Sequence, residues 1–323
     1  MGQYNISIIG SGVVGSATGK GFHKLGQHVT FFDVSKQKLL TLRREGYKTA
    51  NSVKDAISKS EICFVCVNTP PTSSNNTSNL DVDLGKHQDL SQLMSALRDI
   101  VNALNDNIIN KKCLLVFRST MLPGIMRNVA VDYLERNCVL KRGIDYDVCY
   151  NPEFLRQNSA FEDFFTPDRV VIGEDITGSS LPLTDLYSPL TKNIIVTGYE
   201  EAEMAKYVSN CFLALKISYF NQISMMCRAM GINEEQVSLS VSLDKRIGKY
   251  GIKGGRPFAG SCFPKDTEAF ASFARNMNIK PDLIETAISI NNQIEELTSA
   301  KQYVKERAYE KRAGKERCLN EIE

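Results

Sequence analysis

The sequence has little of two features that would point to common classes of function. Only 3 of its 323 residues are histidine, and it shows neither a Ser-His-Asp arrangement nor a metal-ligand cluster, which disfavours a hydrolase or a metalloenzyme. Its 39 basic and 37 acidic residues leave a net charge of +2. Charge therefore gives no reason to expect nucleic acid or an anionic membrane as a partner.

Long apolar runs are also lacking, and we expect no secretory leader. No uninterrupted apolar run approaches the ~18 residues that span a membrane, and no basic segment leads into one at the start. The nine cysteines, an odd number at irregular spacing, fit free thiols better than a disulfide framework. Cys63 and Cys66 lie in the apolar segment "ICFVCV", which favours two buried strand residues over zinc or redox use. We expect a soluble protein of the cytoplasm.

Short apolar runs alternate with segments of helical period through residues 1–197. The runs are "YNISIIGSG", "HVTFFDV", "ICFVCVNTP", "CLLVFRST", "DVCYNPE", "RVVIG" and "NIIVTG", and "LSQLMSALRDIVNAL" is one of the helical segments between them. This alternation predicts an α/β fold, with an N-terminal Rossmann-type, doubly wound and mostly parallel sheet. Its functional edge is expected at the carboxyl ends of the strands.

Helical patterning dominates from residue 198, with no breaker before Gly231. We predict an all-helical central domain at 198–300 with one long connecting helix. The polar segment at 70–83 is rich in turn-forming residues and predicts a mobile surface loop. The tail at 301–323 mixes both charge signs and predicts a solvated or frayed helix.

A glycine-rich turn follows the first predicted strand. Gly10, Gly12 and Gly15 form G-x-G-x-x-G, and Asp33 ends the next strand about 20 residues further on. Gly10 permits a tight turn, Gly12 lets the backbone approach a pyrophosphate, and Gly15 lets the helix pack closely. Asp33 can accept a hydrogen bond from a free ribose 2′-hydroxyl and repels a 2′-phosphate, which predicts NAD rather than NADP. The alternatives are a glycine turn without a dinucleotide and Asp33 as a plain strand-end cap.

Cys262 precedes the predicted helix "PKDTEAFASFARNM", in which Pro264 suits the first turn and Asp266 the positive end of the dipole. A helix N-terminus beside Lys265 favours the thiolate, although a single cysteine is more often buried and inert. Paired with an NAD site, the thiolate indicates a two-step, four-electron oxidation of an alcohol to an acid through a thiohemiacetal.

Other polar residues suit this chemistry. Lys206 and Asn210 share one face of the predicted long helix, where both could stabilise an oxyanion; the alternative is a pair of solvated residues. Glu153 and Thr120 follow predicted strands, at the edge where α/β sheets bind ligands. Glu153 could orient water or act as a base, and Thr120 adds a hydroxyl, unless it only forms a turn.

Together these segments resemble the UDP-glucose/GDP-mannose dehydrogenase family. "GSGVVG", "VNTP", "RSTMLPG", "YNPEFLRQNSA", "PDRVVIG", "EMAKYVSNCFLALKISYFNQIS", "DKRIG" and "GSCFPKD" occur in the family's order. The "NPEFLR" form resembles the UDP-glucose 6-dehydrogenases more than the UDP-N-acetylmannosaminuronate branch. The resemblance implies NAD-dependent oxidation of UDP-glucose to UDP-glucuronate, in polysaccharide biosynthesis, by a homodimer formed through the central helices.

The resemblance also implies a role for each matching residue. The implied catalytic residues are Cys262 as the thioester-forming nucleophile, Lys206 and Asn210 as oxyanion stabilisers, Asp266 and Thr120 as positioners of water, and Glu153 in acid/base work. The implied cofactor residues are Gly10, Gly12, Val13, Val14, Gly15, Asp33, Lys38, Thr69, Thr120 and Lys265. The implied substrate residues are Glu153, Phe154, Leu155, Lys206, Asn210, Lys253, Phe258 and Gly260, with Arg246 reaching the sugar nucleotide of a neighbouring subunit.

The sequence departs from the family pattern in three places. "PFAG" stands before Cys262 where "GFGG" is usual, so Pro257 and Ala259 reduce backbone freedom there, and Arg118 stands where lysine is common. The family's third, Rossmann-like domain is expected to be absent. Two alternatives follow: a dehydrogenase for GDP-mannose or another nucleotide sugar, and a truncated, non-catalytic remnant that binds NAD and dimerises.

Overall fold

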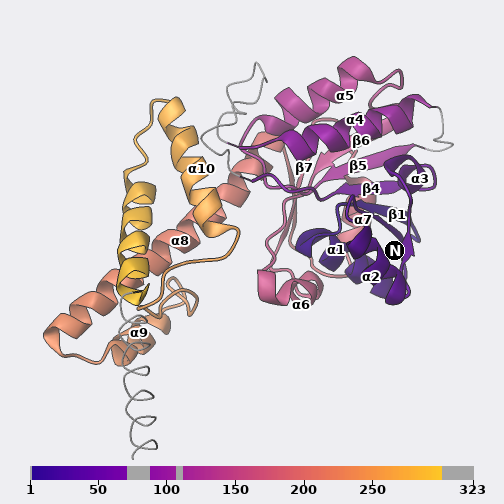
Figure 1. Cartoon of the computed structure of the whole chain (residues 1–323). Helices are drawn as coiled ribbons and strands as arrows, with labels where there is room; N and C mark the ends of the chain where they lie inside the picture. The colour runs from indigo at the N-terminus through magenta and orange to yellow at the C-terminus, as the bar shows by residue number, and fades with distance from the viewer. Residues whose placement is uncertain (1, 71–87, 107–111, 300–323) are drawn as a thin grey trace, which may run out of the picture. The chain divides into compact units, whose positions relative to one another are not determined.

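An eight-stranded sheet organises the first part of the chain in the computed structural model, which describes residues 2–70, 88–106 and 112–299 (Figure 1). The predicted loop after Pro70 and the predicted tail lie outside these residues. The strands are β1 (Asn5–Ile9), β2 (His28–Phe32), β3 (Lys48–Thr49), β4 (Ile62–Val65), β5 (Cys113–Phe117), β6 (Tyr146–Tyr150), β7 (Val170–Gly173) and β8 (Ile194–Thr197).

The strands follow the order β3-β2-β1-β4-β5-β6-β7-β8. Neighbours run parallel except β6 and β7, which are antiparallel. The strand order reverses between β1 and β4, where sheets of this kind bind ligands beyond the carboxyl ends of the strands. The predicted doubly wound, mostly parallel sheet is confirmed.

Helices cover both faces of the sheet, with α4 and α5 on one face and α1 and α2 on the other (Figure 1). These helices and their neighbours are α1 (Val13–Lys24), α2 (Lys36–Arg44), α3 (Val53–Ile57), α4 (Ser91–Asn105), a π-helix (Met126–Val131) that leads into α5 (Asp132–Asn137), a 3-10 turn (Gln157–Ser159), α6 (Ala160–Phe165) and α7 (Leu181–Tyr187). One core cluster joins α1, α6 and α7 to the strands through Phe22, Phe164 and Leu186. Within this cluster, the rings of Phe22 and Phe164 meet edge to face, with their centroids 4.8 Å apart.

The central strands are buried on both faces, as their continuous apolar runs predict. Cys63 and Cys66 are both free and buried, and burial raises the pKa of each thiol to about 12. Neither thiol is therefore ionised near neutral pH, which agrees with two buried core residues.

The second part of the chain is helical, as predicted. It comprises α8 (Tyr199–Met230), α9 (Glu234–Ser242), α10 (Phe263–Asn276) and a further helix at 282–299. Gly231, with φ +68°, follows α8 directly. The chain divides into two compact units between Val208 and Ser209. Because this boundary lies inside α8, the helix contributes to both units. No helix in the described part of the chain is long and apolar enough to cross a membrane.

Glu203 on α8 fixes the segment that follows β5. Its fully buried carboxyl group accepts hydrogen bonds from the Gly124 and Met126 amides, each at 2.7 Å, and the π-helix begins there. Burial raises the pKa of Glu203 to about 8, although the two amides oppose the shift. The folded state therefore holds this proton at pH values where an unfolded chain has released it.

We predict that Glu203 makes stability fall with rising pH. Because its folded pKa is raised, its contribution is complete below about pH 4.5 and is lost as the pH rises towards 8. Glu203→Gln, which cannot titrate, should flatten the dependence of the unfolding free energy on pH in urea melts. Glu201→Gln, at an exposed position of the same helix, is the control and should keep the wild-type slope. Equal slopes for wild type and Glu203→Gln would contradict the prediction.

Candidate active site

At two positions of the glycine-rich turn between β1 and α1, any side chain would clash with neighbouring backbone atoms. A Cβ on Gly10, which has φ +91°, would lie 2.6 Å from the Cys66 carbonyl oxygen, and one on Gly15 would lie 1.9 Å from the Gly10 oxygen. Gly12 differs, because no atom lies within 4 Å of its Cβ position. Gly12 precedes Val13 and Val14 at the start of α1 and provides no capping side chain, so the first helix amides can face a phosphate. This open turn fits the pyrophosphate of a dinucleotide.

Asp33 connects this turn to the end of β2. Its carboxylate accepts the amides of Ser11 at 2.7 Å and Ser35 at 2.8 Å, and Lys38 lies 3.3 Å away. Asp33 therefore caps the strand end, which is one of the two interpretations open from the sequence. An ionised carboxylate has about four acceptor positions, so it can also accept a ribose hydroxyl. The residue fits a 2′-hydroxyl and disfavours a 2′-phosphate.

Thr69 and Thr120 lie together beyond β4 and β5. The Thr69 hydroxyl donates to the Thr120 carbonyl at 2.6 Å. Gln88, almost fully buried, donates to the same carbonyl at 2.7 Å and accepts from the Leu122 amide at 3.4 Å. No local pattern in the sequence marks Gln88, because its role depends on two strand ends that only the sheet brings together.

Lys206 and Glu153 form a buried ion pair. The ammonium donates to the Glu153 carbonyl at 2.6 Å and to its carboxylate at 2.9 Å, with exposed fractions of 2% for Lys206 and 6% for Glu153. The Leu155 amide donates to the other carboxylate oxygen at 2.6 Å. Burial alone would raise the pKa of Glu153, but the Lys206 charge and hydrogen bond, the Leu155 amide and the Arg118 charge together lower it. Glu153 is therefore ionised at neutral pH.

Further contacts hold the turn that carries Glu153. Arg118, buried, donates to the Asn151 side chain and to the Tyr187 hydroxyl, and Asn151 in turn donates to the Val171 carbonyl at 2.7 Å. This network links β5, β6, β7 and α7, and the sequence indicated only Arg118, as a departure from the family pattern. Phe154 places its ring 4.0 Å from the Arg169 guanidinium, a cation–π distance. Leu155 packs against the core cluster.

Cys262 belongs to the second unit and lies at the N-cap of α10, as predicted. Its side chain is partly exposed, and its sulfur lies 3.7 Å from the Ser261 hydroxyl. Pro264 lies in the first turn of α10, as does Asp266. Lys265 forms an ion pair with Asp266, so the charge expected to act on the thiol also has a carboxylate partner.

Asp266 is the fully buried centre of this cluster. The Asn210 side chain donates to one of its oxygens at 2.6 Å, and Lys265 pairs with the other. The structure thus groups the predicted residues in two sets: Thr69, Thr120, Glu153 and Lys206 in the first unit, and Asn210, Cys262, Lys265 and Asp266 in the second. Helix α8 carries Lys206 and Asn210 one turn apart.

The remaining substrate candidates lie between α9 and α10. Phe258 is buried, with its ring centroid 6.3 Å from that of Phe263, whereas Lys253 and Gly260 are exposed. Arg246 is largely exposed and forms an ion pair with Asp244 at 2.6 Å. The reach of Arg246 to the sugar nucleotide of another subunit stays a prediction.

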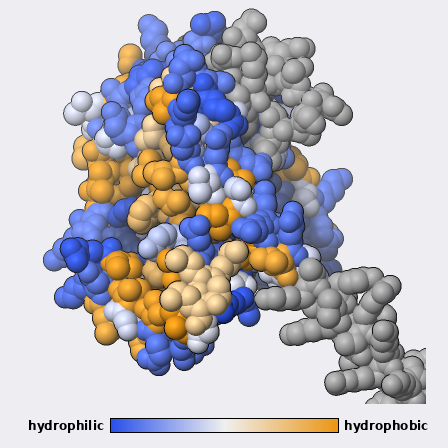
Figure 2. All heavy atoms as spheres, turned by 90° about the vertical axis from the view of Figure 1, so that its left-hand side faces the viewer, coloured by the Kyte–Doolittle hydropathy of each residue, from blue (hydrophilic) through white to orange (hydrophobic). Residues whose placement is uncertain are grey.

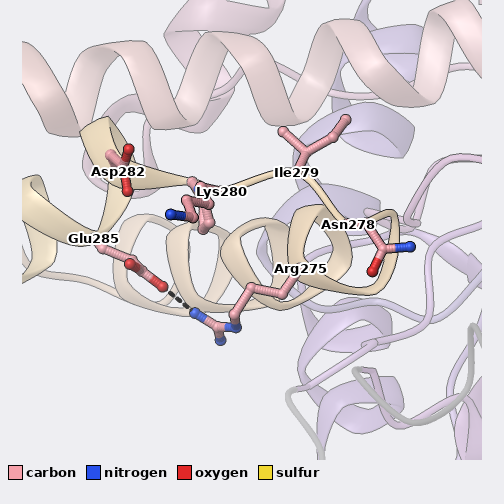
Figure 3. Close-up of a pocket in the computed structure, with 7 residues that line it drawn as sticks. Arg275, Asn278, Ile279, Lys280, Asp282 and Glu285 are labelled. Carbon is pink, nitrogen blue, oxygen red and sulfur yellow. Dashed lines mark hydrogen bonds and ion pairs between the residues drawn. The ribbon is translucent and has the colours of Figure 1, made fainter.

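A hollow at the C-terminal end of α10 is less suitable as an active site than the clusters around Glu153 and Cys262 (Figure 3). It is lined by Arg275, Asn278, Ile279, Lys280, Pro281, Asp282 and Glu285. An ion pair between Arg275 and Glu285 lies across it, and none of the predicted site residues contributes to it. Within the residues that the structure describes, no group of three or more His, Cys, Asp and Glu side chains could hold a metal ion.

Comparison with known proteins identifies the family. Residues 41–191 match the NAD binding domain of the UDP-glucose/GDP-mannose dehydrogenase family, and residues 200–293 match its central domain. The UDP-glucose 6-dehydrogenase of Rickettsia bellii is 34% identical over 312 residues, covering 90% of this chain and 67% of that protein. The chain belongs to the UDP-glucose/GDP-mannose dehydrogenase family. The cofactor of this family's N-terminal domain is NAD, as predicted.

Other relatives give the same result. A UDP-glucose 6-dehydrogenase of Bacillus subtilis is 31% identical, covering 89% of this chain and 66% of its own length. The solved UDP-glucose dehydrogenase of Pyrobaculum islandicum superposes with a TM-score of 0.80 at 30% identity, over 90% of this chain and 68% of that one. A solved GDP-mannose dehydrogenase of Pseudomonas aeruginosa gives 0.68 at 28% identity, over 90% of this chain and 68% of that one. The chain thus spans about two thirds of the length of its relatives.

We predict that Lys206→Met lowers the unfolding free energy by about 3–5 kcal/mol, because it leaves the Glu153 carboxylate buried without its counter-ion. Urea unfolding of the whole chain would measure the loss. The double variant Lys206→Met/Glu153→Gln should lose less than the single one, because it removes the unpaired charge. A single variant as stable as wild type would show that the pair contributes nothing to folding.

Proposed function

We propose that the chain oxidises the C6 hydroxyl of UDP-glucose to the carboxylate of UDP-glucuronate, with NAD as oxidant. The observation that supports this most directly is the arrangement around Cys262: a partly exposed thiol at a helix N-terminus, one turn before a fully buried Asp266 that Asn210 and Lys265 hold. The comparison with UDP-glucose 6-dehydrogenases supports the choice of sugar nucleotide.

Each NAD⁺, when bound, accepts one hydride from the carbon that is oxidised. One alcohol, one water and two NAD⁺ therefore give one carboxylic acid, two NADH and two protons. Gly10, Gly12, Gly15 and Asp33 would hold the NAD⁺. The Cys262 thiolate would add to the carbon of the intermediate aldehyde and form a C–S bond. That bond would persist in the thioester until water attacks the acyl carbon, which releases the acid and returns the thiol.

The other residues have complementary roles in the proposal. Lys206 has three N–H donors, of which two are directed at Glu153, so one remains for an oxyanion. Asn210 lies one turn further along α8 and would act with it. Glu153, held ionised by its lowered pKa, suits the orientation of a water molecule by accepting its hydrogen bond. Thr120, in the first unit, and Asp266, in the second, would each contribute to positioning water.

We also propose a cytoplasmic homodimer that associates through α8. Phe212, Tyr219, Met226 and Met230 are 55–69% exposed and recur at helical spacing along one stripe of this helix. Figure 2, which views the molecule from the left-hand side of Figure 1, shows hydrophobic side chains gathered in patches. Apolar stripes on soluble proteins commonly mark interaction surfaces. Every cysteine in the described ranges is free, which suits a reducing compartment.

The first experiment is to follow NADH absorbance after mixing the chain with NAD and UDP-glucose. We expect two NADH per sugar, with GDP-mannose as the substrate control. Cys262→Ser should lose the complete reaction, because a hydroxyl is a much weaker nucleophile than a thiolate. Cys138→Ser, which removes another partly exposed thiol, should react like wild type. Absence of NADH from a folded, NAD-binding chain would reject the proposed activity and favour a non-catalytic relative.

The dimer proposal has its own test. Met226→Glu should shift the chain from dimer to monomer in analytical ultracentrifugation, because it places a charge in the apolar stripe of α8. Met277→Glu changes an equally exposed methionine of the same unit, outside that stripe, and should leave the dimer intact. A monomeric wild-type chain, or an unchanged Met226→Glu dimer, would exclude this interface.

A further inference from the structure

The irregular segment between α9 and α10 is held in place by side chains. Residues 243–262 form neither helix nor strand, yet Ile252 and Phe258 are buried within it. Ser238 donates to the Ile252 carbonyl at 2.9 Å. An irregular segment of this length inside a compact unit is uncommon and is usually functional. It ends at Cys262, so whatever fixes it also affects the position of the thiol.

Asn221, on α8, is fully buried and binds this segment at two points. Its side-chain oxygen accepts a hydrogen bond from the Gly255 amide at 2.7 Å, and its side-chain nitrogen donates to the Arg256 carbonyl at 2.8 Å. One side chain therefore satisfies two neighbouring backbone groups that no strand partner satisfies.

Asn291, on the helix at 282–299, makes the same kind of contact from another element. It is 5% exposed, accepts from the Phe258 amide at 2.6 Å and donates to the Phe258 carbonyl at 3.2 Å. Together the two asparagines fasten residues 255–258 by four hydrogen bonds to two helices. Both amides have a donor and an acceptor engaged, which fixes their orientation as well as that of the loop.

Two backbone features reinforce this attachment. A Cβ on Gly254 would lie 2.2 Å from the Ser224 Cβ and 2.6 Å from the Phe220 carbonyl oxygen, so only glycine lets the loop approach α8 so closely. Pro257 lies between the two attachment points, where its ring fixes φ and no amide hydrogen needs a partner. The replacement of "GFGG" by "PFAG" thus lies in a loop that is already held.

We propose that Asn221 and Asn291 are positioning residues, which hold the loop at 254–258 in one conformation and thereby set how Phe258 and the Cys262 thiol are presented. The substrate side of this inference rests on the proposed function. A loop ordered before binding does not lose its conformational freedom when the substrate arrives. Neither asparagine needs to touch a reacting atom.

The test uses the whole chain and two readouts that need no catalysis. The first is hydrogen exchange at the Gly255 and Phe258 amides, and the second is alkylation of Cys262 by iodoacetamide, with Cys138 in the same sample as internal reference. Asn221→Ala, Asn291→Ala and Asn291→Asp are compared with wild type. The aspartate variant keeps the acceptor for the Phe258 amide and loses the donor, so it tests the contact with the least change in volume.

Asn233→Ala is the matched control. Asn233 lies in the same unit and accepts two backbone amides, those of Glu235 and Gln236, but it caps α9 instead of holding the loop. We expect both alanine variants at 221 and 291 to accelerate loop exchange about tenfold or more and to alter Cys262 alkylation several-fold, because two hydrogen bonds are lost in each. Asn291→Asp should give a smaller change. Asn233→Ala should leave both readouts unchanged while lowering the melting temperature.

Loop exchange and Cys262 alkylation like those of wild type in all three loop variants would overturn the inference, whatever happens to the melting temperature. If Asn291→Ala does not fold, Asn291→Asp decides the result by the same readouts. A wild-type chain that produces no NADH would reject the proposed function. Hydrogen exchange and alkylation would still show whether the asparagines position the loop and the Cys262 thiol. If the wild-type chain is active, a fall in the kcat of the loop variants with their KM for NAD unchanged supports positioning of the thiol. An unchanged kcat in these variants contradicts it.

Discussion

The buried ion pair between Lys206 and Glu153 is the contact on which the first unit's polar arrangement depends. It joins α8 to the turn after β6 where neither charge reaches solvent. A pair of this kind gives little net stability, because desolvation of both charges offsets their attraction, but either charge alone would be strongly unfavourable. The pair therefore fixes the pairing of these two elements more than it strengthens the fold.

Other side chains of α8 also bind segments at the carboxyl-terminal edge of the sheet. Within the first unit, α8 also contributes Glu203, which binds the segment after β5, and Tyr207, which lies 3.4 Å from the Gln88 amide. Three side chains in little more than one turn thus reach three segments that follow strands. Parallel strands leave carbonyl and amide groups at their carboxyl ends, and polar side chains from a helix are one way to satisfy them.

Much of the fold could be predicted because its signals are local. The apolar runs identified the strands, the glycine spacing identified the turn before α1, and Pro264 placed Cys262 at a helix start. Gln88, Asn221 and Asn291 gave no such signal, since each binds backbone groups at least 19 residues away in the sequence. The division between Val208 and Ser209 was equally hidden, because the helical period continues across it.

The continuity of α8 has a consequence for the proposed chemistry. Lys206 and Asn210 belong to different compact units, but one unbroken helix carries both. Four residues of helix rise about 6 Å along the axis, so the spacing of the two backbone positions is set by the helix itself. Each side chain is then oriented by a carboxylate of its own unit, Glu153 for Lys206 and Asp266 for Asn210. The two proposed oxyanion donors are thus spaced by local structure and aimed by tertiary structure, which explains why the sequence predicted the pair but not its partners.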